Sequence, residues 1–494
     1  MYRKAMTIML FLVLAMSTAK AQSVAFFKNY QAITGLGGVG RSVARTSDGN
    51  IIFAGTDLIP GFGEVISVIK TNLNGDTLWV KHYGEQGKDM EAYSITQLNG
   101  GNILIAGSQV DTGFNTPEQA LLAQISNTGA LQWMKTYPRT GYGTVAHDLR
   151  VLNDGYAFCG TITDSATGIG DAWLVRTNLN GDTLWSRNYG GIDADDSWQI
   201  EKTPDGGFLL AGGSYSYRNG NAEDDAWIVK TDANGNQQWT NHYGNADIQD
   251  WIWSIAPAMV NGTLTGYVFT GVKNYNGSMN SDLFLAKVDT AGNLLWDKSM
   301  PGAAGFRQGF CIEPAGDNGF YVAASEFNAA YGFRLLTMKI DKDGNMVNSL
   351  LHGNQEVIRP RGMFINNLGD AFITGDRIAP AAGGSSFLAR IRNIDSTGSP
   401  VSIIPVAPAT ASVSVYPNPA TDHFTVTSTA GGIIQVVLTD IRGGIAAAAC
   451  GNGAHSQDID LSGVQPGVYI VNIWTAGTGN FPDTSTIVKL SIRK

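Results

Sequence analysis

The sequence predicts an all-β chain: a seven-bladed β-propeller whose last blade is closed by the N-terminal strand, followed by a small Ig-like β-sandwich. Three observations predict it. A unit of two hairpins recurs through residues 24–398, a strand missing from its last copy stands at the N-terminus, and residues 413–494 form short alternating strands without that unit. With 43% hydrophobic and 15% charged residues, and 61 Gly against 16 Pro, the chain is folded and rich in turns.

The repeat is clearest at residues 171–191 and 224–245. In each, an alternating apolar strand runs through Asn/Asp-x-x-Gly into a strand that bears Trp and Tyr. This is the pattern of a tight hairpin, in which glycine supplies the positive φ of the turn. The hairpin glycines recur every 52 to 57 residues, and they are Gly75, Gly129, Gly181, Gly235, Gly292, Gly344 and Gly398. Because a second hairpin precedes each of them, every unit has four short strands, as a propeller blade does.

The two ends of the repeat predict that the ring closes. After Gly398 the seventh unit continues into a linker-like segment and has no Trp/Tyr-bearing fourth strand. Residues 24–30, VAFFKNY, match the register of the fourth strands WSRNY and WTNHY, so we expect the N-terminal strand to complete the seventh blade. A solenoid would instead carry atypical capping repeats at its ends.

Residues 1–21 have the pattern of a signal peptide. Basic residues precede a short apolar stretch, and an Ala-Lys-Ala cleavage site ends at Ala21. We therefore expect export, with cleavage near Ala21-Gln22. No segment approaches 18 uninterrupted apolar residues, so we expect no membrane span in the mature protein.

A separate domain follows the repeats. Residues 399–412 are rich in Pro, Ala and Ser, which predicts a linker. Residues 413–494 contain short alternating strands separated by turns, which predicts a small sandwich. An ordinary Ig-like module is one interpretation of this domain.

Four segments of the tail resemble the type A C-terminal sorting domain of the type IX secretion system. They are VYPNPATDHFTV (415–426), LTDIRG (438–443), DLSGVQPGVYIVNI (460–473) and KLSIRK (489–494). The resemblance implies a Bacteroidota-type source and delivery across the outer membrane by the secretion machinery. The tail is then expected to be removed and the protein released or attached to surface lipopolysaccharide. The residues that carry the motif are Tyr416, Pro417, Asn418, Pro419, Pro466, Gly467 and Tyr469.

Composition and motifs exclude several kinds of function. The net charge of −9, with no run among the 33 basic residues, is unsuited to nucleic acid. Three widely spaced cysteines form neither a disulfide framework nor a metal knuckle. The sequence contains no nucleophile elbow, zinc-protease motif or phosphate-binding loop, so we predict no catalytic residues, no metal and no cofactor. The recurring Gly-x-x-x-Trp spacing resembles the tryptophan-docking motif of quinoprotein propellers, but five copies favour a packing role.

The candidate ligand site is one face of the ring, where the connections between blades and those between second and third strands gather. Aromatic rings beside carboxylates suit sugars, which stack on their apolar faces and hydrogen-bond through hydroxyls. We call this set the predicted rim, and it consists of Trp198, Trp251, Trp253, Tyr215, Tyr217, Tyr275, Asp195, Asp196, Asp224, Asp225 and Asp250. The alternative is that the aspartates accept backbone N–H bonds and order the loops.

We therefore expect an exported propeller, displayed on the cell surface or released, that binds a glycan or protein ligand. A propeller-based carbohydrate-active hydrolase or lyase is one alternative, and a purely structural surface repeat is another. The fold alone does not decide among them.

Overall fold

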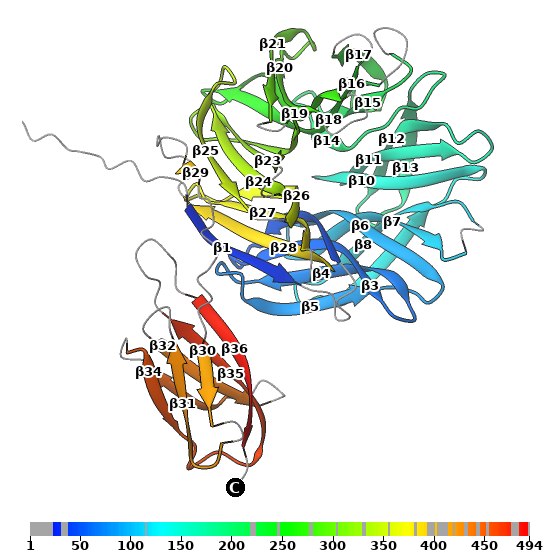
Figure 1. The fold of residues 1–494 in the computed structure, drawn as a ribbon. Coiled ribbons are helices and arrows are strands. Elements are labelled where there is room, and N and C mark those ends of the chain that lie inside the picture. The colour runs from blue at the N-terminus through cyan, green and yellow to red at the C-terminus, as the bar shows by residue number, and fades with distance from the viewer. Residues whose placement is uncertain are drawn as a thin grey trace, which may run out of the picture. The chain divides into compact units, whose positions relative to one another are not determined.

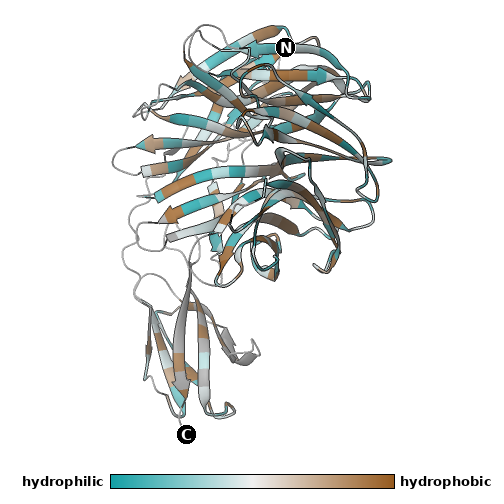
Figure 2. Ribbon diagram, turned by 90° about the vertical axis from the view of Figure 1, so that its right-hand side faces the viewer, coloured by the Kyte–Doolittle hydropathy of each residue, from teal (hydrophilic) through white to brown (hydrophobic). Residues whose placement is uncertain are grey.

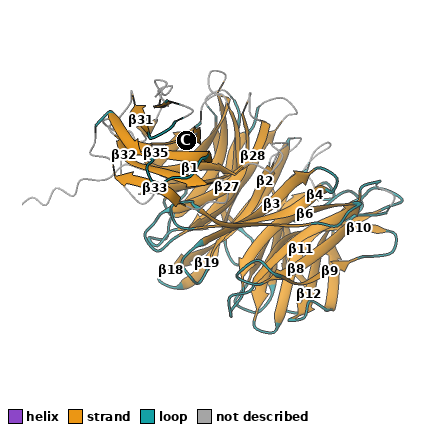
Figure 3. Cartoon of the chain, turned by 90° about the horizontal axis from the view of Figure 1, so that it is seen from below, coloured by secondary structure: helices purple, strands orange, loops and turns teal. Residues whose placement is uncertain are grey.

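The structure is a computed structural model in which all regular secondary structure of the described residues is β, as the sequence predicts (Figures 1 and 3). It forms two compact units, Met1–Ile404 and Pro405–Lys494. The predicted signal peptide and most of the predicted linker lie outside the described residues. These are residues 23–30, 38–113, 116–217, 224–244, 248–275, 280–302, 305–328, 332–353, 356–379, 383–392, 401–402, 413–417, 420–428, 433–440, 445–450, 454–475 and 484–492.

Five separate four-stranded antiparallel sheets follow one another along the first unit, each with its strands in chain order. The first two are β2 (Gly38–Arg45), β3 (Ile51–Ile59), β4 (Gly63–Thr71), β5 (Thr77–Tyr83), and β6 (Lys88–Gln97), β7 (Ile103–Asp111), β8 (Gln119–Ile125), β9 (Leu131–Tyr137). The third and fourth are β10 (Tyr142–Leu152), β11 (Gly155–Asp164), β12 (Gly170–Asn178), β13 (Thr183–Tyr189), and β14 (Gln199–Lys202), β15 (Phe208–Ser214), β16 (Asp225–Thr231), β17 (Gln237–Tyr243). The fifth is β18 (Gln249–Val260), β19 (Thr263–Tyr275), β20 (Asp282–Val288), β21 (Leu294–Pro301).

The remaining strands of this unit form one nine-stranded sheet, which consists of two further four-stranded groups and a two-residue strand. The sixth group is β22 (Arg307–Pro314), β23 (Phe320–Asn328), β24 (Gly332–Ile340), β25 (Met346–His352). The seventh is β26 (Glu356–Ile365), β27 (Ala371–Ala379), β28 (Gly383–Arg392), β1 (Ser23–Tyr30). A short parallel pairing between β24 and β26 joins them, and β29 (Val401–Ser402) pairs with β25. Within the described residues, four-stranded antiparallel groups are thus the repeating element, as predicted.

The N-terminal strand is the fourth strand of the seventh group. β1 runs antiparallel to β28, from Ser23 opposite Arg392 to Tyr30 opposite Ser386. Figure 1 shows this strand in dark blue beside the yellow β27 and β28, although more than 350 residues separate them in the sequence.

Five of the seven fourth strands bind their group to the next through a tyrosine. The hydroxyl of Tyr83 donates to the carbonyl of the hairpin glycine Gly129 in the following group, at 2.8 Å. Tyr137, Tyr189 and Tyr243 make the same bond to Gly181, Gly235 and Gly292, at 2.6 to 2.7 Å. Tyr30 of β1 makes it to Gly75 of the first group, at 2.6 Å. The seventh and first groups are therefore joined as other neighbouring groups are.

The recurring tryptophans pack at the same junctions. A Cβ atom on Gly181 would lie 3.0 Å from the indole of Trp133, and one on Gly235 would lie 2.6 Å from that of Trp185. The hairpin glycine is needed there both for its positive φ and for the space that the indole fills. The Gly-x-x-x-Trp pattern therefore has a packing role at these junctions.

The core of the first unit lies between neighbouring groups. Leu104 and Leu122 of the second group, for example, pack in one cluster with Phe158 and Trp173 of the third. Figure 2 shows apolar and polar residues interspersed along the strands. Each group therefore buries its apolar side chains against its neighbours.

The second unit contains two antiparallel sheets that share one apolar core. One sheet has the order β30 (Val413–Tyr416), β31 (His423–Ser428), β34 (Ser456–Asp460). The other has the order β33 (Ile445–Cys450), β32 (Ile433–Asp440), β35 (Gly467–Thr475), β36 (Thr484–Ile492). Phe424 and Ile459 of the first sheet lie in one cluster with Leu438, Val471 and Leu490 of the second.

No helix in the part of the chain that the structure describes has the length and hydropathy needed to cross a membrane.

Candidate functional site

A β-bulge interrupts the pairing of the first and second strands at the same place in most groups. It leaves one residue of the first strand out of the ladder, and such a residue changes the direction of its side chain. The bulged residues are Arg41, Tyr93, His147, Trp253, Phe310 and Arg361. In the fourth group β14 begins at Gln199, and Trp198 occupies the equivalent place, with its N–H donating to the carbonyl of Ala211 at 2.8 Å.

A glycine in the second strand makes room for the bulge. A Cβ atom on Gly55 would lie 1.6 Å from the carbonyl oxygen of Val39, and one on Gly107 would lie 1.9 Å from that of Glu91. At these two positions a larger residue would force the strands apart. A glycine occupies this place in six of the seven groups, and in the sixth group Ala324 does, opposite Gly309.

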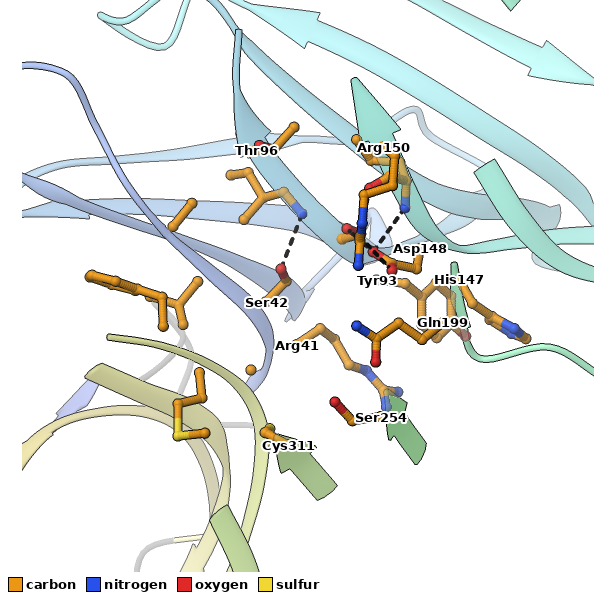
Figure 4. A pocket seen from close by; sticks show the side chains of 18 of the residues that line it. Arg41, Ser42, Tyr93, Thr96, His147, Asp148, Arg150, Gln199, Ser254 and Cys311 are labelled. Atoms are coloured by element: carbon orange, nitrogen blue, oxygen red, sulfur yellow. Dashed lines mark hydrogen bonds and ion pairs between the residues drawn. The ribbon is translucent and has the colours of Figure 1, made fainter. Parts of the chain in front are cut away.

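Seven side chains, one from each group, line a cavity of about 830 Å³ in the first unit. We call them the collar: Arg41, Tyr93, His147, Trp198, Trp253, Phe310 and Arg361. The first strands of all seven groups contribute to the lining. Figure 4 shows Arg41, Tyr93 and His147 converging from different strands.

The collar is a continuous series of ring contacts from one arginine to the other. The guanidinium carbons of Arg41 and Arg361 lie 5.1 Å from the ring centre of Tyr93 and 5.3 Å from that of Phe310, respectively. Between them, ring centres are separated by 5.2 Å for Tyr93–His147, 4.2 Å for His147–Trp198, 4.8 Å for Trp198–Trp253 and 6.0 Å for Trp253–Phe310. Such distances are those of favourable aromatic and cation–π pairs.

The two arginines come from adjacent strands. A Cβ atom on Gly362 of β26 would lie 2.8 Å from Cα of Ser42 and 3.0 Å from the carbonyl oxygen of Arg41 in β2. The Nε of Arg361 donates to Asp376 at 2.9 Å. The Nη2 of Arg41 lies 3.5 Å from a carboxylate oxygen of Glu91, and its Nε is buried with no partner among the described residues.

The residue after the collar position fastens one first strand to the next. The Oγ of Ser42 accepts the N–H of Ile95 at 3.2 Å (Figure 4). Asp148, Gln199 and Ser254 accept the N–H of Ile200, Ile255 and Ile312 in the same way, at 3.2, 2.7 and 3.1 Å. These bonds fix the spacing of the strands that carry the collar.

His147 is an uncharged aromatic member of the collar. Burial, together with the positive charge of Arg41, lowers its pKa to about 4, although its bond to a carbonyl opposes this shift. Its Nδ1–H donates to the carbonyl of Ser197 at 2.9 Å. The neutral ring lies nearly parallel to that of Trp198, with an interplanar angle of 10°.

A cluster of charged side chains also lines the cavity. Arg150 bonds to Asp148 at 2.7 Å and to Glu201 at 2.5 Å. Burial raises the pKa of the nearby Glu313 to about 8, helped by the negative charge of Glu201 and opposed by Arg150. The carboxyl of Glu313 is therefore protonated at neutral pH.

Glu313 makes the stability of the protein depend on pH. The unfolded chain releases its proton near pH 4.5 and the folded chain only near pH 8, so the folded state binds more protons between these values. The contribution of Glu313 to the free energy of unfolding therefore falls as pH rises from about 4.5 to about 8. We expect Glu313→Gln to stabilise the protein at pH 8 by up to about 4 kcal/mol, since the two pKa values lie about 3.5 apart and one pKa unit is worth about 1.4 kcal/mol, and to change little at pH 4.5.

Urea unfolding of both proteins at pH 4.5, 6 and 8 measures this difference. Asp182→Asn is a control, because Asp182 is an exposed carboxylate on an outer hairpin. A Glu313→Gln variant that loses stability at pH 8 would contradict the assignment of a protonated carboxyl.

Of the aromatic residues of the predicted rim, two line the cavity and the others lie outside its lining. Trp198 and Trp253 belong to the collar and line the cavity. Trp251 lies outside the lining and contacts Trp253 and Tyr275, with ring centres 6.1 and 5.6 Å apart. Tyr217 stacks on Trp227 and donates to the carbonyl of Gly190, and Tyr215 accepts a hydrogen bond from Gln249 at 3.1 Å.

The aspartates of the predicted rim bond to the loops around them. Asp195 is buried and accepts bonds from Ser214, from Ser216 and from the N–H of Gly191. Asp196 accepts from Gly213 and Trp198, and burial raises its pKa to about 6. Asp225 and Asp250 are also buried, Asp250 accepts the N–H of Asn274 at 2.7 Å, and the backbone carbonyl of Asp224 accepts the N–H of Asp250. A ligand role for these carboxylates stays a prediction.

Five members of the collar were not predicted from the sequence: Arg41, Tyr93, His147, Phe310 and Arg361. Their chemical types differ, so no residue pattern links them. Their position does: Arg41 stands fourteen residues before Gly55, as Tyr93 does before Gly107. In six of the seven groups the second-strand glycine is thus the feature of the sequence that locates the collar position, and in the sixth group Ala324 stands in its place.

Over the described residues, no three His, Cys, Asp or Glu side chains are grouped as ligands for a metal ion. Cys159 and Cys311 are buried free thiols, and burial raises the pKa of both.

The motif residues of the tail lie at two places in the second unit. Tyr416 ends β30 and is exposed, as is Pro417. Pro466 and Gly467 are exposed at the start of β35, and the hydroxyl of the buried Tyr469 donates to the carbonyl of Gln465 at 2.9 Å. Asn418 and Pro419 lie outside the described residues.

Residues 414–484 match the family described as secretion system C-terminal sorting domain. This part of the chain is a type IX sorting domain. The sorting domain marks the protein for export by the type IX machinery, to the cell surface or the medium. The resemblance to a type IX sorting domain is confirmed, and three of its four sequence segments lie within the matched residues, whereas KLSIRK (489–494) follows them.

No curated protein matches the chain. Among solved structures, it is similar to a protein of unknown function from Dyadobacter fermentans, with 9% identity, a TM-score of 0.43, and coverage of 75% of this chain and 99% of that one. A protein of unknown function from Bacteroides caccae has 13% identity, a TM-score of 0.34, and coverage of 60% and 94%. The β-1,2-mannobiose phosphorylase of Listeria innocua has 10% identity, a TM-score of 0.31, and coverage of 63% and 92%. At these values the likeness does not indicate what this chain binds.

Proposed function

We propose that the chain is an exported β-propeller that binds a glycan or protein ligand at the collar, on the cell surface or after release. Residues 1–21 are the signal peptide, residues 22–398 the seven-bladed propeller, residues 399–412 a linker, and residues 413–494 the sorting domain with an Ig-like sandwich fold. The type IX machinery is its partner during export.

The contacts between groups support the closed ring. The first strands touch in chain order, and β26 of the seventh group also contacts β2 of the first. Val43 and Phe53 of the first group share a core cluster with Phe372 and Leu388 of the seventh. Together with the Tyr30 bond to Gly75, these contacts give each of the seven groups a neighbouring group on both sides.

The ligand-binding role rests on one observation, the aromatic series of the collar inside a cavity lined by all seven groups. Proteins bind sugar rings by stacking them on aromatic faces next to a few polar groups. Tyr93, Trp198 and Trp253 are each only partly buried and so keep surface available to a ligand. A glycan is the ligand that this combination favours.

Binding to a glycan array by the secreted protein tests the proposal. We expect Trp198→Ala and Trp253→Ala each to weaken binding by about tenfold, because an aromatic contact is worth about 0.5–1.5 kcal/mol beyond the apolar area that it buries. The control is Tyr275→Ala, which removes a ring that contacts Trp251 outside the cavity. Loss of binding in the control alone would move the site to the predicted rim, and no binding by the unaltered protein would contradict a glycan ligand.

A glycan-active hydrolase or lyase that works in the same cavity is the second candidate. The observation that favours it is the protonated carboxyl of Glu313 near the carboxylate of Glu201, since a protonated acid can donate to a departing sugar oxygen. Release of new chain ends from glycans bound on the array distinguishes an enzyme from a binding protein.

A further inference from the structure

We propose that the collar recognises an acidic sugar, a pyranose that carries a carboxylate, with Arg41 and Arg361 binding the carboxylate. This inference rests on the proposed glycan-binding function and narrows it to one class of ligand. Three features of the described residues support it.

The first feature is the sign of the charge in the cavity. The chain as a whole has more acidic than basic residues, 42 against 33. The lining reverses this balance, with five basic side chains (Arg41, Arg45, Arg150, Lys202 and Arg361) and three carboxyl groups (Asp148, Glu201 and Glu313). Because Glu313 is protonated at neutral pH, only two of the three are charged there. Glu91 and Asp376 pair with Arg41 and Arg361 from outside the lining, which leaves one positive charge in excess, and a cavity of this sign favours anions over cations.

The second feature is the placement of the two arginines. Arg41 and Arg361 occupy equivalent bulge positions in β2 and β26, which touch at Gly362. Each guanidinium faces one carboxylate, that of Glu91 or that of Asp376, and its other N–H groups can donate to a second carboxylate from a ligand. The buried Nε of Arg41 has no partner among the described residues, so it is a donor that a ligand can satisfy.

The third feature joins the charge to the aromatic rings. Each arginine lies directly beside an aromatic member of the collar, Arg41 beside Tyr93 and Arg361 beside Phe310. A ligand here meets donors for a carboxylate and a surface for an apolar ring face at the same time. A hexuronate residue has both features, whereas a neutral hexose lacks the carboxylate and a free carboxylate lacks the ring.

The inference is tested with pairs of polysaccharides that differ only in charge. Galacturonan, alginate and hyaluronan are each presented in native form and after chemical reduction of their carboxyl groups, which leaves neutral chains. Binding is measured at about 0.15 M salt, where distant charges are largely screened. We expect at least one native polysaccharide to be bound about tenfold or more tightly than its reduced form.

Variants of the two arginines complete the test. We expect Arg41→Gln and Arg361→Gln each to abolish the preference for the native form, and Arg41→Lys to retain part of it. The control is Lys342→Gln, which removes one charge from an exposed outer hairpin and should change binding by less than about twofold. Thermal unfolding of each variant checks that it is folded.

The outcomes separate this inference from the proposed function. Equal binding of native and reduced polysaccharides, or loss of preference in Lys342→Gln as well, overturns the acidic-sugar inference and leaves glycan binding standing. If the protein binds none of the six samples, the inference is overturned. The glycan array alone then decides whether the protein binds glycans. Binding of acetate, a carboxylate without a ring, as tightly as of free galacturonate would show that the ring series of the collar is not part of the site and would overturn the inference.

Discussion

Removing residues 23–30 is expected to lower the melting temperature of the protein by about 10 °C or more. The deletion takes away β1, the fourth strand of the seventh group, and exposes the edge of β28. It also removes Phe26 and Phe27, whose rings contact Phe372 and Phe387, and the Tyr30 bond to Gly75. Three aromatic side chains at about 1–2 kcal/mol each, and about 2–4 °C per kcal/mol, give this magnitude.

The comparison is between chains that begin at Ser23 and at Gln31, measured by differential scanning calorimetry. Adding the peptide SVAFFKNY to the shorter chain should restore part of the lost stability, because the edge of β28 is then paired again. Equal melting temperatures of the two chains would contradict a structural role for the N-terminal strand.

A single hydroxyl offers a finer version of the same experiment. Tyr30→Phe should cost about 1 kcal/mol, as should Tyr83→Phe and Tyr189→Phe, because each removes one bond to the hairpin glycine of the next group. A strand that merely frayed at the terminus would make Tyr30→Phe neutral while the other two variants were destabilised.

The repeating unit could be predicted from the sequence because its causes are local. The hairpin glycines adopt positive φ in the structure, as at Gly75 and Gly235, and this need fixes them at each turn. The N-terminal strand could be assigned because its Asn-Tyr ending, at Tyr30, stands in the register of the other fourth strands. Where the turn chemistry is strict, spacing alone gives the order of the strands.

The collar could not be predicted in the same way, because its members share a backbone position and not a side-chain type. Trp198 and Trp253 were singled out as aromatic residues at the start of first strands, and both line the cavity. Arg41 and His147 have no such feature in the sequence, since only the bulge turns them into the cavity. The predicted aspartates were noticed because they recur, and recurrence is also what loop-ordering residues show.

Removing the sorting domain, residues 405–494, is expected to leave the protein in the periplasm, with less than about a tenth of it outside the cell. The two units are separately compact, and the described core of the second unit is its own. We therefore expect the remaining unit to fold and to keep its ligand binding. Immunoblots of periplasm, cell surface and medium, from a host that has the type IX system, give the distribution.

Two point variants test whether export requires the sorting domain to be folded. Val471→Asp places a charge in the core of the domain, at a position with 0% exposure, and should prevent export by unfolding it. Gln465→Asp adds the same side chain at an exposed position and should leave export intact. Fusing residues 405–494 to a fluorescent protein that carries residues 1–22 should in turn carry it out of the cell. Export of the Val471→Asp variant at the normal level would mean that the machinery reads a linear segment and not the folded domain.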